Sequence, residues 1–189
     1  MNSPTLIQRL PQIFGFVFLI TICCQQLAAQ HRVLTQGNNR LAIVAADGSI
    51  EWEMPWQGTH DIHWLPNERI LVRQGKSKIV EIDTRKKKVV WSYDSATENG
   101  NAGKEVEVHA FQPLENGVVM IAESGPGRIL EIDREGKLLS EVKLKLDNPH
   151  PHMDTRLARK LNNGNYLVSH EGDGTVREYD NEGTVIWEY

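Results

Sequence analysis

Residues 114–142 read LENGVVMIAESGPGRILEIDREGKLLSEV, and residues 161–189 read LNNGNYLVSHEGDGTVREYDNEGTVIWEY. The two stretches align without a gap at an offset of 47 residues, and 10 of their 29 positions are identical. A third, looser copy begins at Leu65 and reaches Trp91. Self-similarity with a period of roughly 40–50 residues is typical of an array of supersecondary units. The sequence therefore predicts a repeat protein.

Each copy has the pattern of four short strands joined by tight turns. Asn-Gly between apolar stretches, as at Gly117 and Gly164, is a strong signal for a hairpin turn in which both central residues have positive φ. The looser copy has Glu68 where the others have glycine, so we expect a different turn there. The third strand of each copy, such as Ile129 to Asp133, alternates apolar and polar residues, which indicates a half-buried strand.

Four-stranded units repeated around an axis are the blades of a β-propeller. A shorter hairpin, Ile43 to Trp52, precedes the three copies, so residues 30–189 contain about three and a half blades. The predicted fold is all-β: a partial propeller of four-stranded antiparallel blades. Because propellers typically have about 4–8 blades, we expect this domain to be incomplete, either as a fragment of a longer protein or as part of a ring that another chain completes.

Residues 1–29 have the pattern of a secretory signal peptide. Arg9 is the only charged residue among them, an apolar run follows from Ile13 to Cys24, and the small residues Ala28 and Ala29 precede Gln30. The apolar run is shorter than the roughly 20 residues that a membrane-spanning helix needs. We therefore expect cleavage before Gln30 and a secreted or periplasmic protein without a membrane span. A retained N-terminal anchor is the alternative.

The charge balance argues against a nucleic-acid partner. The chain has 21 Lys and Arg residues against 25 Asp and Glu, a formal net charge of −4, whereas nucleic-acid binding requires clustered basic residues. The basic run from Arg85 to Lys88 is expected at the tip of a hairpin, in solvent. Both cysteines, Cys23 and Cys24, lie in the predicted signal peptide, so the mature chain must be stabilised by packing alone.

A loose motif, Asp180-x-x-Gly183-x-x-x-Trp187, closes the last copy, and shorter versions end at Trp52 and Trp91. The motif resembles the repeat of quinoprotein-type (PQQ-like) β-propellers, in which a tryptophan late in each blade docks between neighbouring blades. The resemblance implies a structural role for these three tryptophans, with Ser140 as a break in the series. It implies the fold and not quinone binding, because the stacking partners and calcium site of a quinone have no counterparts here. No cofactor is predicted.

A second similarity is to bacterial arylsulfotransferase-like propellers, whose blades carry His-Asp followed closely by Leu-Pro-Asn-Gly-Asn-type turns. Here His60-Asp61 precedes Leu65-Pro66-Asn67, and residues 162–167 repeat the turn. That family transfers sulfuryl groups through a histidine nucleophile. Its complete catalytic set has no match in this chain.

Three residues occupy equivalent positions, five residues before the aligned leucines: His60, His109 and Arg156. Since the first strand of each blade lines the central channel of a propeller, we expect these side chains to converge near the axis. They would suit a carboxylate, sulfate or phosphate, with Arg156 as a bidentate donor. In an arylsulfotransferase-like enzyme His60 or His109 would be the nucleophile. The alternative is a water-filled polar channel without a specific ligand.

A proline-rich segment, Pro149 to Asp154, places His150 and His152 two residues apart and ends in a carboxylate. Imidazole and carboxylate groups suit zinc and similar ions. This spacing without a third ligand favours a stiff loop between blades, so His150, His152 and Asp154 are weak candidates and no metal site is predicted. The loop from His170 to Gly174 is interpreted as structural, because its two glycines recur in the preceding copy.

The favoured function is that of an exported binding or scaffold module for an unidentified protein or small anionic ligand. No P-loop, nucleophile elbow, zinc-finger or dinucleotide motif is present. The alternative is an arylsulfotransferase-like enzyme that binds an anionic substrate in the channel. The sequence leaves catalysis open and favours a non-catalytic role, since fold alone does not fix function.

Overall fold

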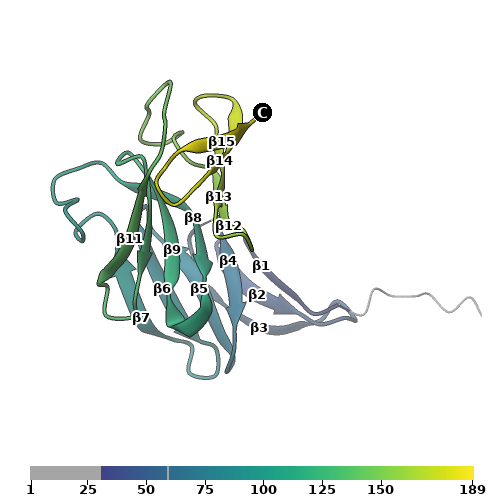
Figure 1. Ribbon diagram of the computed structural model, residues 1–189. Helices are drawn as coiled ribbons and strands as arrows, with labels where there is room; N and C mark the ends of the chain where they lie inside the picture. Colours follow the sequence, from purple (N-terminus) through teal and green to yellow (C-terminus); the bar gives the residue numbers. More distant parts are fainter. Residues whose placement is uncertain (1–30, 59) are drawn as a thin grey trace, which may run out of the picture.

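The computed structural model describes residues 31–58 and 60–189, and its strands form four antiparallel sheets (Figure 1). The signal peptide predicted for residues 1–29 lies outside the described residues. The first sheet has three strands, β1 (Val33–Gly37), β2 (Arg40–Val44) and β3 (Ile50–Pro55). The second sheet has four, β4 (Ile62–Leu65), β5 (Arg69–Gln74), β6 (Lys78–Asp83) and β7 (Lys88–Asp94).

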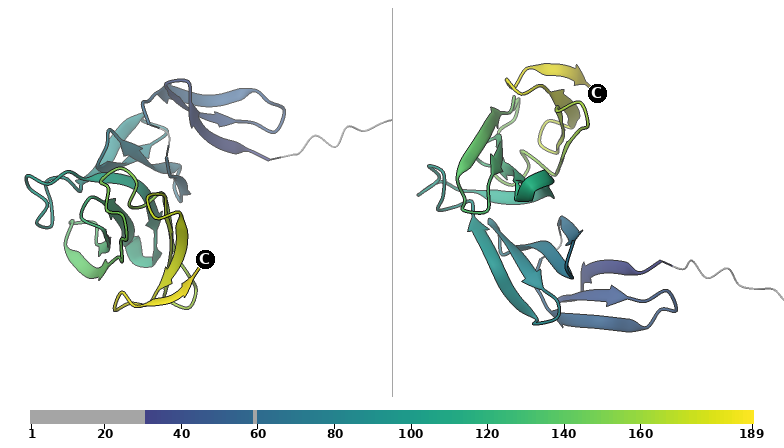
Figure 2. Two further views of the ribbon diagram at one scale, coloured as in Figure 1. Left: turned by 90° about the horizontal axis from the view of Figure 1, so that it is seen from above. Right: turned by 60° about the horizontal axis from the view of Figure 1, so that its bottom comes forward.

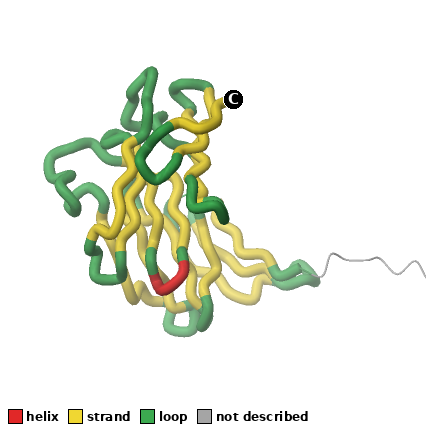
Figure 3. Tube along the Cα trace, in the orientation of Figure 1, coloured by secondary structure: helices red, strands yellow, loops and turns green. Residues whose placement is uncertain are grey.

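The third and fourth sheets repeat the four-stranded pattern. The third contains β8 (Glu107–Pro113), β9 (Val119–Ser124), β10 (Arg128–Ile132) and β11 (Leu138–Lys143). The fourth contains β12 (Leu157–Lys160), β13 (Tyr166–His170), β14 (Thr175–Tyr179) and β15 (Val185–Glu188). In the described part of the chain the only helical element is a 3₁₀ turn at Glu115–Gly117 (Figure 3).

Each sheet is a meander, because strands that follow one another in the sequence are neighbours in the sheet. The sheets succeed one another along an open arc (Figure 2). The first strands of the three four-stranded sheets come together, since β8 contacts both β4 and β12. The predicted all-β partial propeller of four-stranded blades is therefore confirmed. No helix in the described residues is long and apolar enough to cross a membrane.

The first sheet is larger than the predicted hairpin. β1 pairs with β2 along its whole length, from Val33 opposite Val44 to Gly37 opposite Arg40. The turn between them, Asn38-Asn39, has positive φ at both residues. The sequence analysis missed β1 because only Val33 and Leu34 of its five residues are apolar.

The hydrophobic core lies between neighbouring sheets. One cluster joins Leu41 of the first sheet to Ile70 and Val80 of the second. Equivalent clusters join the second sheet to the third and the third to the fourth. The half-buried pattern expected for the third strands is consequently wrong for β6, where every residue from Ile79 to Asp83 is buried because both faces of the sheet are covered. β14 in the last sheet is less buried.

The tight turns show where glycine is required. Gly117 and Gly164 both have positive φ, 79° and 91°. The different turn expected at Glu68 is wrong, because Asn67 and Glu68 have φ of 61° and 58°, close to the values at Asn116 and Gly117. A left-handed conformation costs a residue with a Cβ roughly 1–2 kcal/mol. Thr84 holds Glu68 in it by donating two hydrogen bonds to the Glu68 carbonyl, from the backbone N at 3.0 Å and from Oγ1 at 2.8 Å.

Two of the three tryptophans dock on the next sheet. The indole nitrogen of Trp52 donates to the carbonyl of Thr84 at 2.9 Å, and that of Trp91 donates to the carbonyl of Arg134 at 2.7 Å. Trp187 has the equivalent position in the repeat but is 50% exposed. In the described chain it does not lie between two sheets. The reason is that no described sheet follows the fourth.

The interface that carries Ser140 is bridged in another way. Lys160 and the hydroxyl of Tyr166, both in the fourth sheet, bind the carboxylate of Glu131 in the third sheet. Tyr166 is almost fully buried. A tyrosine and an ion pair therefore join these two sheets at the position where the tryptophan series is broken.

An ion pair also joins the second sheet to the fourth, although the third sheet lies between them in the order of the blades. Arg159 of β12 donates to both oxygens of Asp61, just before β4, at 2.6 Å each. The same carboxylate accepts a bond from the backbone N of Phe111 in β8, at 3.1 Å. Asp61 thus connects the first strands of the second, third and fourth sheets.

Candidate functional site

The residues predicted to converge near the axis do lie close together. The imidazole rings of His60 and His109 have centroids 4.5 Å apart, and the ring of His152 lies 5.2 Å from that of His109. Arg156 contacts His152, with Nη2 at 3.1 Å from Nε2. His152 comes from the loop between the third and fourth sheets, and the sequence analysis did not place it with the other two histidines.

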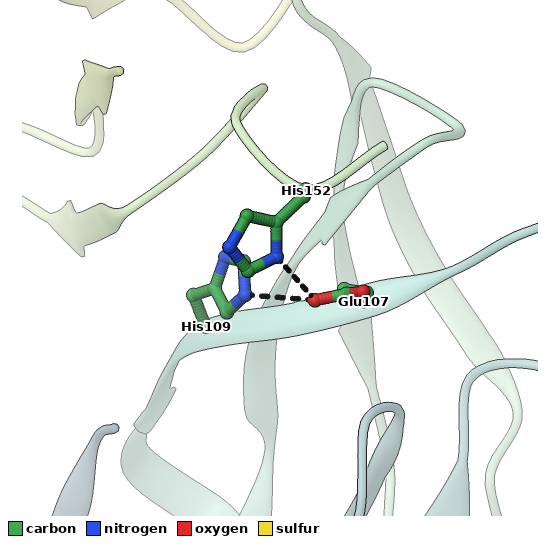
Figure 4. Close-up of side chains that lie close together, drawn as sticks. All are labelled: Glu107, His109 and His152. Carbon is green, nitrogen blue, oxygen red and sulfur yellow. Dashed lines mark hydrogen bonds and ion pairs between the residues drawn. The ribbon is translucent and has the colours of Figure 1, made fainter. Parts of the chain in front are cut away.

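Glu107 is the centre of this cluster (Figure 4). Its carboxylate is buried, with Oε2 at 2.8 Å from His152 Nδ1 and 3.2 Å from His109 Nε2, and Oε1 at 2.9 Å from Lys76 Nζ. Burial acts to raise the pKa of Glu107, but hydrogen bonds from Lys76 and His152 and the positive charge of Lys76 outweigh it and lower the pKa to about 2. Glu107 is therefore a buried anion at neutral pH.

The ring of His109 is fixed at both nitrogens. Nδ1 donates to the carbonyl of Thr155 at 2.9 Å, which leaves the lone pair of Nε2 directed at Glu107. A β-bulge between Val108 and Ala110 places His109 in this position. Burial, together with the guanidinium groups of Arg156 and Arg73, lowers the pKa of His109. A buried ring with both nitrogens occupied does not favour the nucleophile role predicted for His109.

Arg73 of β5 forms no direct ion pair with any described residue, although the charge of Glu107 acts on it. Its Nη1 donates to the carbonyl of Val108 at 3.1 Å, and its Nε is buried without a hydrogen-bond partner. Burial and then the charge of Arg73 lower the pKa of His60 to about 4, so His60 is neutral at physiological pH. Arg156 differs from Arg73, because it forms an ion pair with Glu171.

The three weak metal candidates do not form one group. Asp154 is buried, and its carboxylate accepts bonds from the backbone N of His150 at 2.6 Å and of Gly125 at 2.8 Å. It closes the loop and is not directed at either imidazole. Only His152 is brought to other possible ligands, and those are Glu107 and His109.

The sequence analysis missed Glu107 and Arg73. One signal was present for Glu107: it precedes His109 by two residues, a spacing that puts both side chains on one face of a regular strand. For Arg73 there was none, since its position depends on how β5 packs against β8.

The repeats, the sheets and the docking tryptophans define a PQQ-like β-propeller protein. The family model described as "Outer membrane protein assembly factor BamB" matches residues 37–189, and the chain belongs to this family. A search of curated proteins found no match.

Solved structures show the same fold. A protein of unknown function from Bacteroides caccae is 24% identical, with a TM-score of 0.63, over 84% of this chain and 56% of that one. BamB from Moraxella catarrhalis is 16% identical, with a TM-score of 0.55, over 84% of this chain and 48% of that one. A streptogramin B lyase is 16% identical, with a TM-score of 0.54, over 80% and 47%. The chain thus spans about half the length of these structures.

Proposed function

We propose that this chain is part of an exported β-propeller that acts as a binding module, and that Arg73 and His60, beside the cluster around Glu107, hold an acidic group of a protein partner. The family description, an outer membrane assembly factor, supports a periplasmic location and a protein partner. The signal-peptide pattern of residues 1–29 supports export. The acidic group would be a side-chain carboxylate or the C-terminal carboxylate of the partner.

The main support for this proposal is the buried guanidinium nitrogen of Arg73 that has no hydrogen-bond partner. A buried polar group without a hydrogen-bond partner costs about 1–3 kcal/mol, and the Nε of Arg73 is such a group. A guanidinium group matches the two oxygens of a carboxylate in a bidentate arrangement. A ligand carboxylate beside His60 would therefore satisfy Arg73 and would also accept a hydrogen bond from the N–H of the neutral imidazole.

Binding is tested with tetraglycine, which has a free C-terminal carboxylate, and with the same peptide amidated at its C terminus. In calorimetric titrations the acid form is expected to bind and the amide form is not. Arg73→Gln is expected to weaken binding by about tenfold or more, because hydrogen bonds to charged groups contribute about 1.5–3 kcal/mol. Arg85→Gln, on the exposed turn between β6 and β7, is the matched control. Equal binding of the two peptides, or unchanged affinity in Arg73→Gln, contradicts the proposal.

Export is tested separately by N-terminal sequencing of the protein recovered from a periplasmic fraction. Gln30 is the expected first residue. Recovery of the intact N-terminus from the membrane fraction would instead support the retained anchor.

A further inference from the structure

We propose that Glu107, His109 and His152 form a binding site for one divalent transition-metal ion of the zinc class. The three residues offer one carboxylate oxygen and two imidazole nitrogens. This inference is independent of the acidic partner proposed above, because it uses a different set of side chains and a different ligand.

The distances fit an ion of this size. The three ligand atoms, Glu107 Oε2, His109 Nε2 and His152 Nδ1, all lie within 4.8 Å of one another. Oε2 is 3.2 Å from the His109 nitrogen and 2.8 Å from the His152 nitrogen. A tetrahedral zinc ion with bonds of about 2.0 Å holds its ligand atoms roughly 3.3 Å apart. Only small movements are needed, and His152 is free to make them because it lies on a loop with its side chain half exposed.

The surroundings of His109 give a second reason for a cation at this point. The Thr155 carbonyl holds a proton of His109 on Nδ1, so in the neutral ring the lone pair of Nε2 faces the Glu107 carboxylate at 3.2 Å. Two acceptors at hydrogen-bond distance need a proton or a metal ion between them. A carbonyl that binds the far nitrogen of a histidine is also the usual support for a metal-ligating imidazole.

Glu107 is prepared in the same way. Lys76 binds Oε1 at 2.9 Å, and both histidines approach Oε2. One oxygen is therefore oriented by a neighbour while the other faces the two nitrogens, as in metal sites where outer partners position the ligands. Two imidazoles and one carboxylate are a donor set typical of zinc sites that keep a fourth position open for water or a ligand.

Metal binding would require one local change. Nδ1 of His152 has to coordinate the ion through its lone pair, so its proton must be on Nε2, which accepts a bond from Arg156 in the metal-free structure. Arg156 has to turn away from His152. Glu171, which already forms an ion pair with Arg156, can hold it in the new position.

The test uses the full-length protein, freed of metal by chelation and titrated with zinc chloride in a calorimeter and with cobalt chloride by visible absorption. One ion per chain is expected, with the absorption bands of a nitrogen- and oxygen-ligated cobalt ion. His152→Ala and Glu107→Gln are expected to weaken zinc binding by about tenfold or more. His109 is not substituted because its buried ring contributes to packing.

His150→Ala is the matched control, since His150 is exposed on the same loop and its Nδ1 accepts a hydrogen bond from the backbone N of His152 instead of facing Glu107. It is expected to bind zinc as the wild type does, and so is Arg73→Gln, which separates this site from the anion site. Thermal unfolding of each metal-free variant checks that it is folded. Absence of saturable binding overturns the proposal. So does unchanged affinity in folded His152→Ala, or a loss in His150→Ala that equals the loss in His152→Ala.

Discussion

Among single residues, His170 links the stability of the fold to pH. Its ring is buried, with Nδ1 donating to the Asp154 carbonyl at 2.7 Å and Nε2 accepting from the Tyr179 hydroxyl at 2.8 Å. Acceptance at Nε2 requires the neutral imidazole. Burial lowers its pKa below the ordinary value of 6.5.

The unfolded chain binds a proton at His170 at a higher pH than the folded chain does. Stability from this residue is therefore complete above pH 6.5 and is lost as pH falls from 6.5 towards the lower folded pKa. We expect the free energy of unfolding, measured in urea at a series of pH values, to fall less steeply in His170→Gln than in the wild type. His31→Gln, at an exposed position, should keep the wild-type slope. Identical slopes in all three proteins would contradict this.

Asp173 is a second residue whose charge stabilises the fold. It binds the fully buried guanidinium of Arg177 at 2.6 Å and accepts bonds from the backbone N of Asp147 and of Asn148. Burial acts to raise its pKa, but these bonds outweigh it and lower the pKa to about 2. Its contribution is therefore present above pH 3.8 and lost as pH falls towards 2.

Asp173→Asn is expected to reduce the free energy of unfolding at pH 7 by about 1–3 kcal/mol, the range for hydrogen bonds to charged groups. The measurement is urea unfolding, with Glu182→Gln on an exposed turn as the control. An effect no larger than that of the control would show that Arg177 is satisfied by its other carboxylate partners.

Alignment of the repeats predicts part of the candidate site, residue by residue. It brings His60, His109 and Arg156 together because equivalent positions in a propeller converge. It says nothing of the bulge that directs His109 towards Glu107, or of the loop that carries His152 back to β8. The contact between Glu107 and His152 joins residues 45 positions apart in the sequence and depends on loop conformation.

At the scale of strands and sheets, Trp91 and Trp187 are a matched pair that differ in what covers them. Trp91 donates to the Arg134 carbonyl, and the Arg134 guanidinium lies 4.1 Å from its ring. Trp187 has the equivalent place in the repeat but is half exposed. We expect Trp91→Ala to cost about 3–5 kcal/mol, as large-to-small core substitutions do, and Trp187→Ala about 0.5 kcal/mol, as at surface sites.

Thermal and urea unfolding of both variants gives the comparison. An equal loss of unfolding free energy in Trp91→Ala and Trp187→Ala would contradict the docking role of Trp91.

The strands themselves were largely predictable, and the exceptions have physical causes. Alternation and turn residues locate strands β2 to β15. Burial on both faces of β6 depends on two neighbouring sheets and not on the strand's own pattern. The conformation of Glu68 depends on Thr84, a residue 16 positions away.

For the molecule as a whole, the open arc leaves the outer face of the last sheet uncovered in the described chain (Figure 2). Ile186, Trp187 and Tyr189 on β15 and just after it are each at least half exposed. Exposed strand edges and apolar faces template association with other chains. We expect residues 30–189, produced by themselves, to self-associate, and Ile186→Lys to reduce this. Light scattering is the measurement. A monodisperse monomer that unfolds cooperatively would contradict the expectation.

The ion pair between Asp61 and Arg159 couples the unfolding of blades that are not adjacent. In an array of repeats each unit normally contacts only its neighbours, so the terminal unit can fray while the others stay intact. Here the fourth sheet is bonded directly to the start of the second, across the strand of the third. Local opening of the last blade therefore has to break a contact that the second blade also uses. Cooperativity along this stretch extends over two blade boundaries, and amide hydrogens of β4 and β12 should exchange together.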